Sequence, residues 1–97
     1  MSKTLVVFSR TDLGSKSRSF VQAAHSVAQF VIDNPGLWMN DRLIILRSDN
    51  EESIRRMSSV HKDRPQAMFF EPDYGNEATA VAIFGLEDQE VYHHNLL

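Results

Sequence analysis

Polar side chains of different chemistry recur at helical spacing in the first third of the chain. Arg18, Gln22, His25 and Gln29 stand at i, i+4, i+7 and i+11, so a helix would place them on one narrow stripe. Lys16 lies just before them in a polar, serine-rich loop. Together these residues bring a cation, an amide and an imidazole into one line, which can form a polar site. The same pattern also fits an ordinary solvent-facing stripe with an incidental histidine.

Such a stripe requires a helix whose other side rests on a sheet. The preceding loop offers Ser15, Ser17 or Ser19 as a cap, because each hydroxyl can accept a free first-turn N–H. The helix runs to about Asp33, where the following Asn-Pro-Gly sequence ends it. We expect the apolar side of this helix to face a sheet and to consist of Phe20, Ala23, Ala24, Val27, Phe30 and Val31.

Four apolar, β-rich runs predict four strands. They occupy residues 4–9, 42–48, 66–71 and 79–84. A short helix opens with acids after residue 49 and ends near residue 62, with Ile54, Met57 and Val60 on its inner face. The acidic tail, residues 86–97, has room for one further helical turn.

This order of elements predicts one small α/β domain over residues 1–97. The first two connections between strands are long enough for right-handed crossovers between parallel strands. The last connection is short enough for an antiparallel hairpin. The prediction is therefore a four-stranded mixed sheet with helices packed on it.

Composition limits the function classes. The chain is 42% hydrophobic and 24% charged, has no cysteine, and has no apolar run of membrane-spanning length, so we expect a cytoplasmic protein with no membrane partner. All ten Lys and Arg residues lie at or before Arg64, while residues 65–97 hold six acids. A formal net charge of −3 therefore still allows a local basic face for phosphate. Scattered, solvated charge is the alternative reading.

The loop and helix carry a family resemblance. The sequence Arg10-Thr11-Asp12-Leu13, then Ser15-Lys16-Ser17-Arg18, then Gln22 and His25, resembles the signature of type-2 peptidyl-tRNA hydrolases. That family has an Arg-x-Asp-Leu turn, a Gly-Lys-Gly-Lys loop and a helix reading Ala-Ala-Gln-x-x-His-Ala. Here serines replace the glycines, Arg18 replaces the second lysine, and the loop is one residue shorter.

The resemblance implies hydrolysis of the ester between a peptide and tRNA, without a cofactor. It places a cation near the ester oxygen or the terminal phosphate, and an amide that orients water or substrate. The residues that it implies for catalysis are Lys16, Arg18, Gln22, His25 and Glu71, the last in place of the family's aspartate. The residues that it implies for substrate binding are Arg10, Asp12 and Asp73, which is also a second candidate for the aspartate position.

Several alternatives remain open on sequence grounds. The departures from the family pattern also suit a catalytically degenerate member that binds RNA or protein. A structural homodimer that pairs through strand 79–84 is a third reading. Asp12 can pair with Lys16 or Arg18, or simply cap a turn. His93 and His94 are a poor metal site, because adjacent side chains point apart in regular structure.

Overall fold

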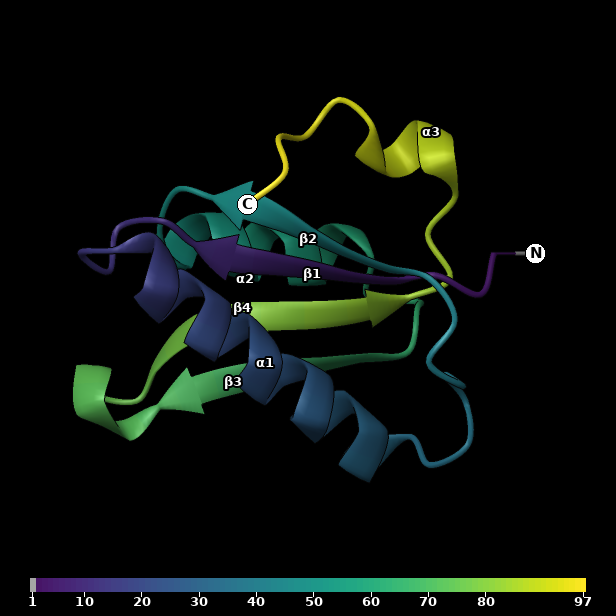
Figure 1. Cartoon of the computed structure of the whole chain (residues 1–97), viewed down its shortest axis with the longest axis horizontal. Helices are drawn as coiled ribbons and strands as arrows, with labels where there is room; N and C mark the ends of the chain where they lie inside the picture. Colours follow the sequence, from purple (N-terminus) through teal and green to yellow (C-terminus); the bar gives the residue numbers. More distant parts are fainter. Residues whose placement is uncertain (1) are drawn as a thin grey trace.

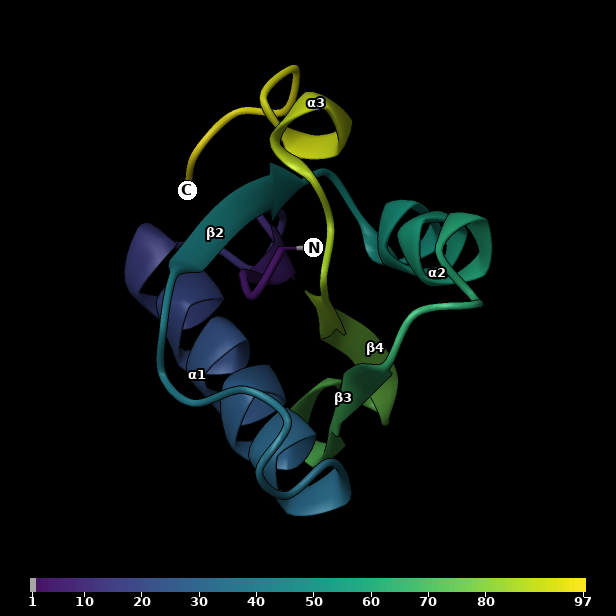
Figure 2. The same cartoon turned by 90° about the vertical axis from the view of Figure 1, so that its right-hand side faces the viewer.

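The computed structural model describes residues 2–97 as a mixed sheet between two helical layers. Figures 1 and 2 show α1 on one face of the sheet and α2 on the other. The fold class is the predicted one. The elements in chain order are β1 (Leu5–Arg10), α1 (Lys16–Asp33), β2 (Leu43–Ser48), α2 (Glu51–Val60), β3 (Gln66–Glu71), the 3₁₀ turn η1 (Pro72–Tyr74), β4 (Glu77–Phe84) and α3 (Asp88–Val91).

The strands lie in the order β2-β1-β4-β3. β1 is parallel to β2 and antiparallel to β4, and β3 forms the expected antiparallel hairpin with β4. This topology brings the end of β1, the end of β3 and the start of β4 to one end of the sheet, at the left of Figure 1. Of the polar residues singled out from the sequence, Arg10 and Glu71 therefore lie at that end.

The strand prediction was wrong about which strand is an edge. β4 pairs on both sides, so it cannot offer an edge to a second copy. β3 is one edge, and the other edge, β2, is covered by the C-terminal tail. Leu96 bridges Leu46, Arg47 N–H donates to the Asn95 carbonyl, and Leu97 N–H donates to the Ile45 carbonyl, both at 2.9 Å or less.

Both main helices begin at side-chain caps. The Ser15 hydroxyl accepts the N–H of Arg18, and the Asn50 side chain accepts the N–H of Ser53. α1 ends at the residue before the Asn-Pro-Gly sequence, as predicted. In α2, Ile54 is buried and Met57 is half-buried, but Val60 is 61% exposed, because the helix is already ending there. The expectation for Val60 was wrong.

The orientation of α1 also differs from the prediction. Phe20 is 43% exposed and Val31 45% exposed, and Ala24 is exposed as well. The buried face consists of Ser19, Gln22, Ala23, Ser26 and Phe30, with Val27 half-buried.

The surface beneath α1 explains this orientation. The core between α1 and the sheet contains Ala67, Ala80 and Ala82, so the small residues Ala23 and Ser26 face a shallow surface. Small facing residues allow this part of the helix to lie close to the sheet, while Phe30 fills the core farther along the helix. Apolar periodicity alone misplaced the face because it scored serine and glutamine as outward.

Within residues 2–97, no helix has the length and apolar character that crossing a bilayer requires.

Candidate active site

A buried three-residue network links α1 to the two strands of the hairpin. Gln22 Nε2 donates to Glu71 Oε1 at 3.0 Å, and Thr79 Oγ1 donates to Gln22 Oε1 at 2.7 Å. Gln22 is 3% exposed and Thr79 is fully buried, whereas Glu71 is half-buried and reaches the surface. The expected outward position of Gln22 was therefore wrong. From its buried position, the Gln22 amide fixes the orientation of the Glu71 carboxylate.

Glu71 also accepts a weak hydrogen bond from the turn that follows it. The N–H of Asp73 lies 3.5 Å from Glu71 Oε2, within the 3₁₀ turn η1. The Asp73 side chain itself is exposed and has no part in the buried network. Of the two carboxylates considered for this position, Glu71 is thus the one that meets Gln22.

Arg10 forms a second network beside the first. It is 7% exposed, and it pairs with Asp12 through two hydrogen bonds of 2.8 and 3.0 Å and with Glu77 Oε1 at 2.7 Å. The guanidinium also donates to the Ala78 carbonyl at 3.3 Å. The hydrogen bonds and charge of Arg10 hold the pKa of Asp12 below its ordinary value. Asp12 therefore pairs with Arg10 rather than with Lys16 or Arg18, and the network fixes the loop.

The two cationic side chains at the start of α1, Arg18 and Lys16, have different surroundings. Arg18 Nη1 donates to the Leu13 carbonyl at 3.2 Å and packs against Gly14. A Cβ at Gly14 would lie 3.1 Å from that guanidinium nitrogen, and the backbone there has φ of 103°, so glycine suits the position on both counts. Lys16 is exposed and lines a small cavity of about 110 Å³ with Thr11, Ser19, Arg47 and Leu97.

His25 stands apart from these networks. Its ring stacks flat on Phe69 of β3, with centroids 4.4 Å apart and an interplanar angle of 6°. The histidine is exposed on its other side. An imidazole fixed in this way presents an edge and a face to solvent, which suits stacking of a base or ring of a ligand more than proton transfer at Glu71.

The structure thus divides the predicted residues into groups. It joins Gln22 to Glu71 and Arg10 to Asp12, and it leaves Lys16, Arg18 and His25 outside both networks. Sequence reasoning missed Thr79 and Glu77. The only signal for them was a polar pair, Glu77 and Thr79, at alternating positions in the opening of an apolar strand.

Comparison with known proteins identifies neither a family nor a function for this chain. No model of a known protein family matches the sequence, and no curated protein matches it. Among residues 2–97, no three His, Asp or Glu side chains come close enough together to hold a metal ion.

Proposed function

We propose that the protein hydrolyses the ester bond of peptidyl-tRNA, in the cytoplasm, at the Gln22–Glu71 pair. The supporting observation is the 3.0 Å hydrogen bond between these two side chains, which lie 49 positions apart. The resemblance to type-2 peptidyl-tRNA hydrolases implied catalytic roles for an amide on this helix and for a carboxylate after this strand, each considered separately. Their contact supports the proposal because it brings the two implied residues together.

In this proposal Glu71 is the base. Its carboxylate takes a proton from a water molecule, whose oxygen adds to the ester carbonyl. Collapse of the adduct breaks the bond to the ribose oxygen, which receives the proton from Glu71 and leaves as a hydroxyl. The products are a peptide with a free carboxyl group and tRNA. Gln22 is a positioning residue, since it acts through Glu71.

Lys16 has a separate role in this geometry. Six residues of helix separate it from Gln22, which corresponds to about 9 Å along the axis. That separation suits a phosphate of the acceptor end better than the ester oxygen. Arg18 fixes the loop through the Leu13 carbonyl, and His25 on Phe69 offers a stacking surface for a terminal base.

A second candidate function is RNA or protein binding without catalysis. It is favoured because the Gln22 amide already has both a donor and an acceptor partner within the protein. Under this reading Lys16 binds phosphate and Glu71 only supports the hairpin.

Homodimerisation is a further part of the proposal. The outer face of α1 carries Phe20, Val21, Ala24, Ala28, Val31 and Ile32 without an intervening charge, and all are exposed. This apolar outer face has small residues at its centre and large ones at both ends, so two copies can pack these faces together antiparallel about a two-fold axis. Sedimentation of the wild type beside Ile32→Lys tests this, with a concentration-dependent dimer expected only for the wild type.

The deciding experiment measures release of labelled peptide from peptidyl-tRNA. Wild type is compared with Glu71→Gln, with Lys16→Ala, and with Lys62→Ala, an exposed lysine beyond α2, as the matched control. Hydrolysis predicts that Glu71→Gln loses turnover, that Lys16→Ala mainly raises KM, and that Lys62→Ala matches the wild type. A folded wild type that releases no peptide across pH and salt contradicts the hydrolase proposal.

Equilibrium binding of tRNA to the same proteins distinguishes the second function from hydrolysis. If the protein only binds, Lys16→Ala weakens binding and reduces its salt dependence, while Glu71→Gln leaves binding unchanged.

A further inference from the structure

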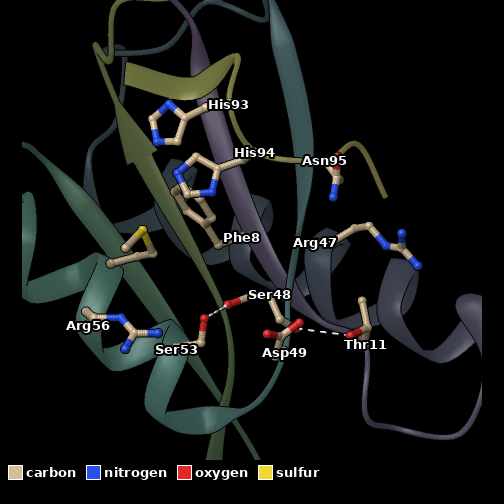
Figure 3. A pocket seen from close by; sticks show the side chains of 11 residues that line it. Phe8, Thr11, Arg47, Ser48, Asp49, Ser53, Arg56, His93, His94 and Asn95 are labelled. Carbon is tan, nitrogen blue, oxygen red and sulfur yellow. Dashed lines mark hydrogen bonds between the residues drawn. The ribbon is translucent and has the colours of Figure 1, made fainter. Parts of the chain in front are cut away.

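A larger cavity lies on the other face of the sheet, away from the Gln22–Glu71 pair. Its volume is about 570 Å³, within the range of small-molecule sites. Figure 3 shows it between α2, the ends of β1 and β2, and the C-terminal tail. The lining residues are Phe8, Thr11, Arg47, Ser48, Asp49, Ser53, Arg56, Met57, His93, His94 and Asn95.

A guanidinium and two imidazoles line facing walls of this cavity. Within residues 2–97, Arg56 has no hydrogen bond or ion pair to another side chain, and Figure 3 shows its guanidinium directed toward Ser53. His93 and His94 lie across from it with ring centroids 4.4 Å apart. His94 packs edge-on against Phe8 at 5.2 Å, which fixes its ring at the cavity wall.

Hydroxyl groups line the part of the cavity that lies between Arg56, the imidazoles and Asp49. Ser48 and Ser53 share a hydrogen bond of 2.6 Å, and Thr11 donates to the Ser48 carbonyl at 3.3 Å. A hydroxyl pair of this kind can turn one O–H toward an anion. The cavity thus combines a free guanidinium, two imidazoles and hydroxyl donors, which is a donor set for phosphate.

Within residues 2–97, Asp49 is the only acid in the lining of this cavity. Figure 3 places it between Thr11 and the Ser48–Ser53 pair, away from the imidazoles. A carboxylate there disfavours a ligand that is anionic throughout and favours one with hydroxyl groups at that end, because carboxylates accept hydrogen bonds from hydroxyls. Arg47 lies on the outer rim and its guanidinium points away from the imidazoles.

We propose that this cavity binds a phosphorylated sugar, with the phosphate against Arg56, His93 and His94 and the sugar hydroxyls against Asp49. The site is distinct from the Gln22–Glu71 network and does not depend on the proposed hydrolysis. A mononucleotide supplies the same chemistry as a free sugar phosphate, with its base directed out of the cavity.

Ribose 5-phosphate is the test ligand, followed by amide chemical shifts and calorimetry on the full chain. Expected shifts fall on Ser53, Arg56 and His94, and ribose alone produces none at the same concentration. Arg56→Gln weakens binding roughly tenfold or more, since it removes a charge-assisted hydrogen bond. Arg55→Gln is the matched control, because Arg55 is on the same helix but pairs with Glu51.

Asp49→Asn tests the sugar end separately. It should reduce the preference for ribose 5-phosphate over inorganic phosphate, because only the sugar contacts this side chain. If adenosine 5′-monophosphate binds more tightly than ribose 5-phosphate and shifts the same amides, the phosphorylated sugar of the proposal is part of a nucleotide.

Four results would overturn the proposal. The first is the absence of shifts at millimolar ribose 5-phosphate in a folded protein. The second is an equal loss of binding in Arg55→Gln and Arg56→Gln. The third is equal displacement by sulfate, which would mean an adventitious ion only. Shifts at these amides with tRNA, but with no small phosphate, would likewise contradict a sugar-phosphate site.

Discussion

The amide of Gln22 bridges Glu71 and Thr79, donating to the first at 3.0 Å and accepting from the second at 2.7 Å. Because both ends of the amide are used, the α1 helix is tied to β3 and to β4 by one side chain. The bridge occupies a position that an apolar residue would ordinarily fill. Burying a polar side chain at this position costs folding free energy, and the same bridge fixes the orientation of the Glu71 carboxylate.

Removal of this bridge should destabilise the protein. Gln22→Ala leaves the Thr79 hydroxyl buried without its acceptor, and we expect a loss of about 1–3 kcal/mol in the free energy of unfolding. Gln29→Ala is the control, because Gln29 only pairs with Asp33 at the surface, and its change should stay within about 0.5 kcal/mol. Denaturant unfolding measures both. Equal losses would contradict the buried bridge.

The Arg10 network should make stability depend on acid pH. The pKa of Asp12 is lowered in the folded state, so its contribution is present above the ordinary aspartate pKa and is lost as pH falls below it. We expect Asp12→Asn to be less stable than the wild type at pH 7 and to lose less stability between pH 5 and pH 2. Denaturant unfolding across that range checks this. Parallel pH curves for the two proteins would refute the pairing.

His94 should also favour its deprotonated form in the folded state, but in a higher pH range than Asp12. Burial, and then the charges of His93 and His61, lower the pKa of His94, so the folded state favours the neutral imidazole. Its contribution is therefore present above the ordinary histidine pKa of about 6.5 and is lost as pH falls through that value. A proton titration of the ring by NMR should give a midpoint below 6.5, and His93→Ala should move that midpoint upward. A midpoint at or above 6.5 would contradict the burial.

The orientation of α1 can be tested with two neighbouring residues. Phe30 is fully buried, so Phe30→Ala should cost about 3–5 kcal/mol of stability. Val31 is exposed in the monomer, so Val31→Ala should cost the monomer less than about 1 kcal/mol. The helix orientation expected from apolar periodicity would instead make both changes severe. Thermal or denaturant unfolding of the pair distinguishes the two orientations.

The tail should protect the edge of β2. Arg47 N–H donates to the Asn95 carbonyl at 2.8 Å, so this amide should exchange slowly with solvent deuterium. A chain that ends at residue 94 should exchange it rapidly and should aggregate more readily, because the edge is then open. The amide of Val7, in the middle of β1, serves as the internal control. Fast exchange of the Arg47 amide in the full chain would show that the tail does not pair.

The limits of most elements follow from local chemistry that the sequence displays. β3 was predicted at residues 66–71, as observed, because prolines stand on both sides of it. α1 was placed from its serine cap and from the Asn-Pro-Gly sequence that ends it. The apolar runs sufficed to predict a mixed sheet, since two long connections and one short one leave few arrangements.

Tertiary structure alone decided which residues meet. Ser19 is buried because its hydroxyl donates to the Arg10 carbonyl at 2.6 Å, and Gln22 is buried because Glu71 and Thr79 are its partners. A periodic pattern records whether a side chain is polar, but not whether a distant strand will satisfy its hydrogen bonds. The sequence therefore determined the elements and their order. The rotation of α1, the central place of β4 and the pairing of Gln22 with Glu71 came from packing and from the need to satisfy buried polar groups.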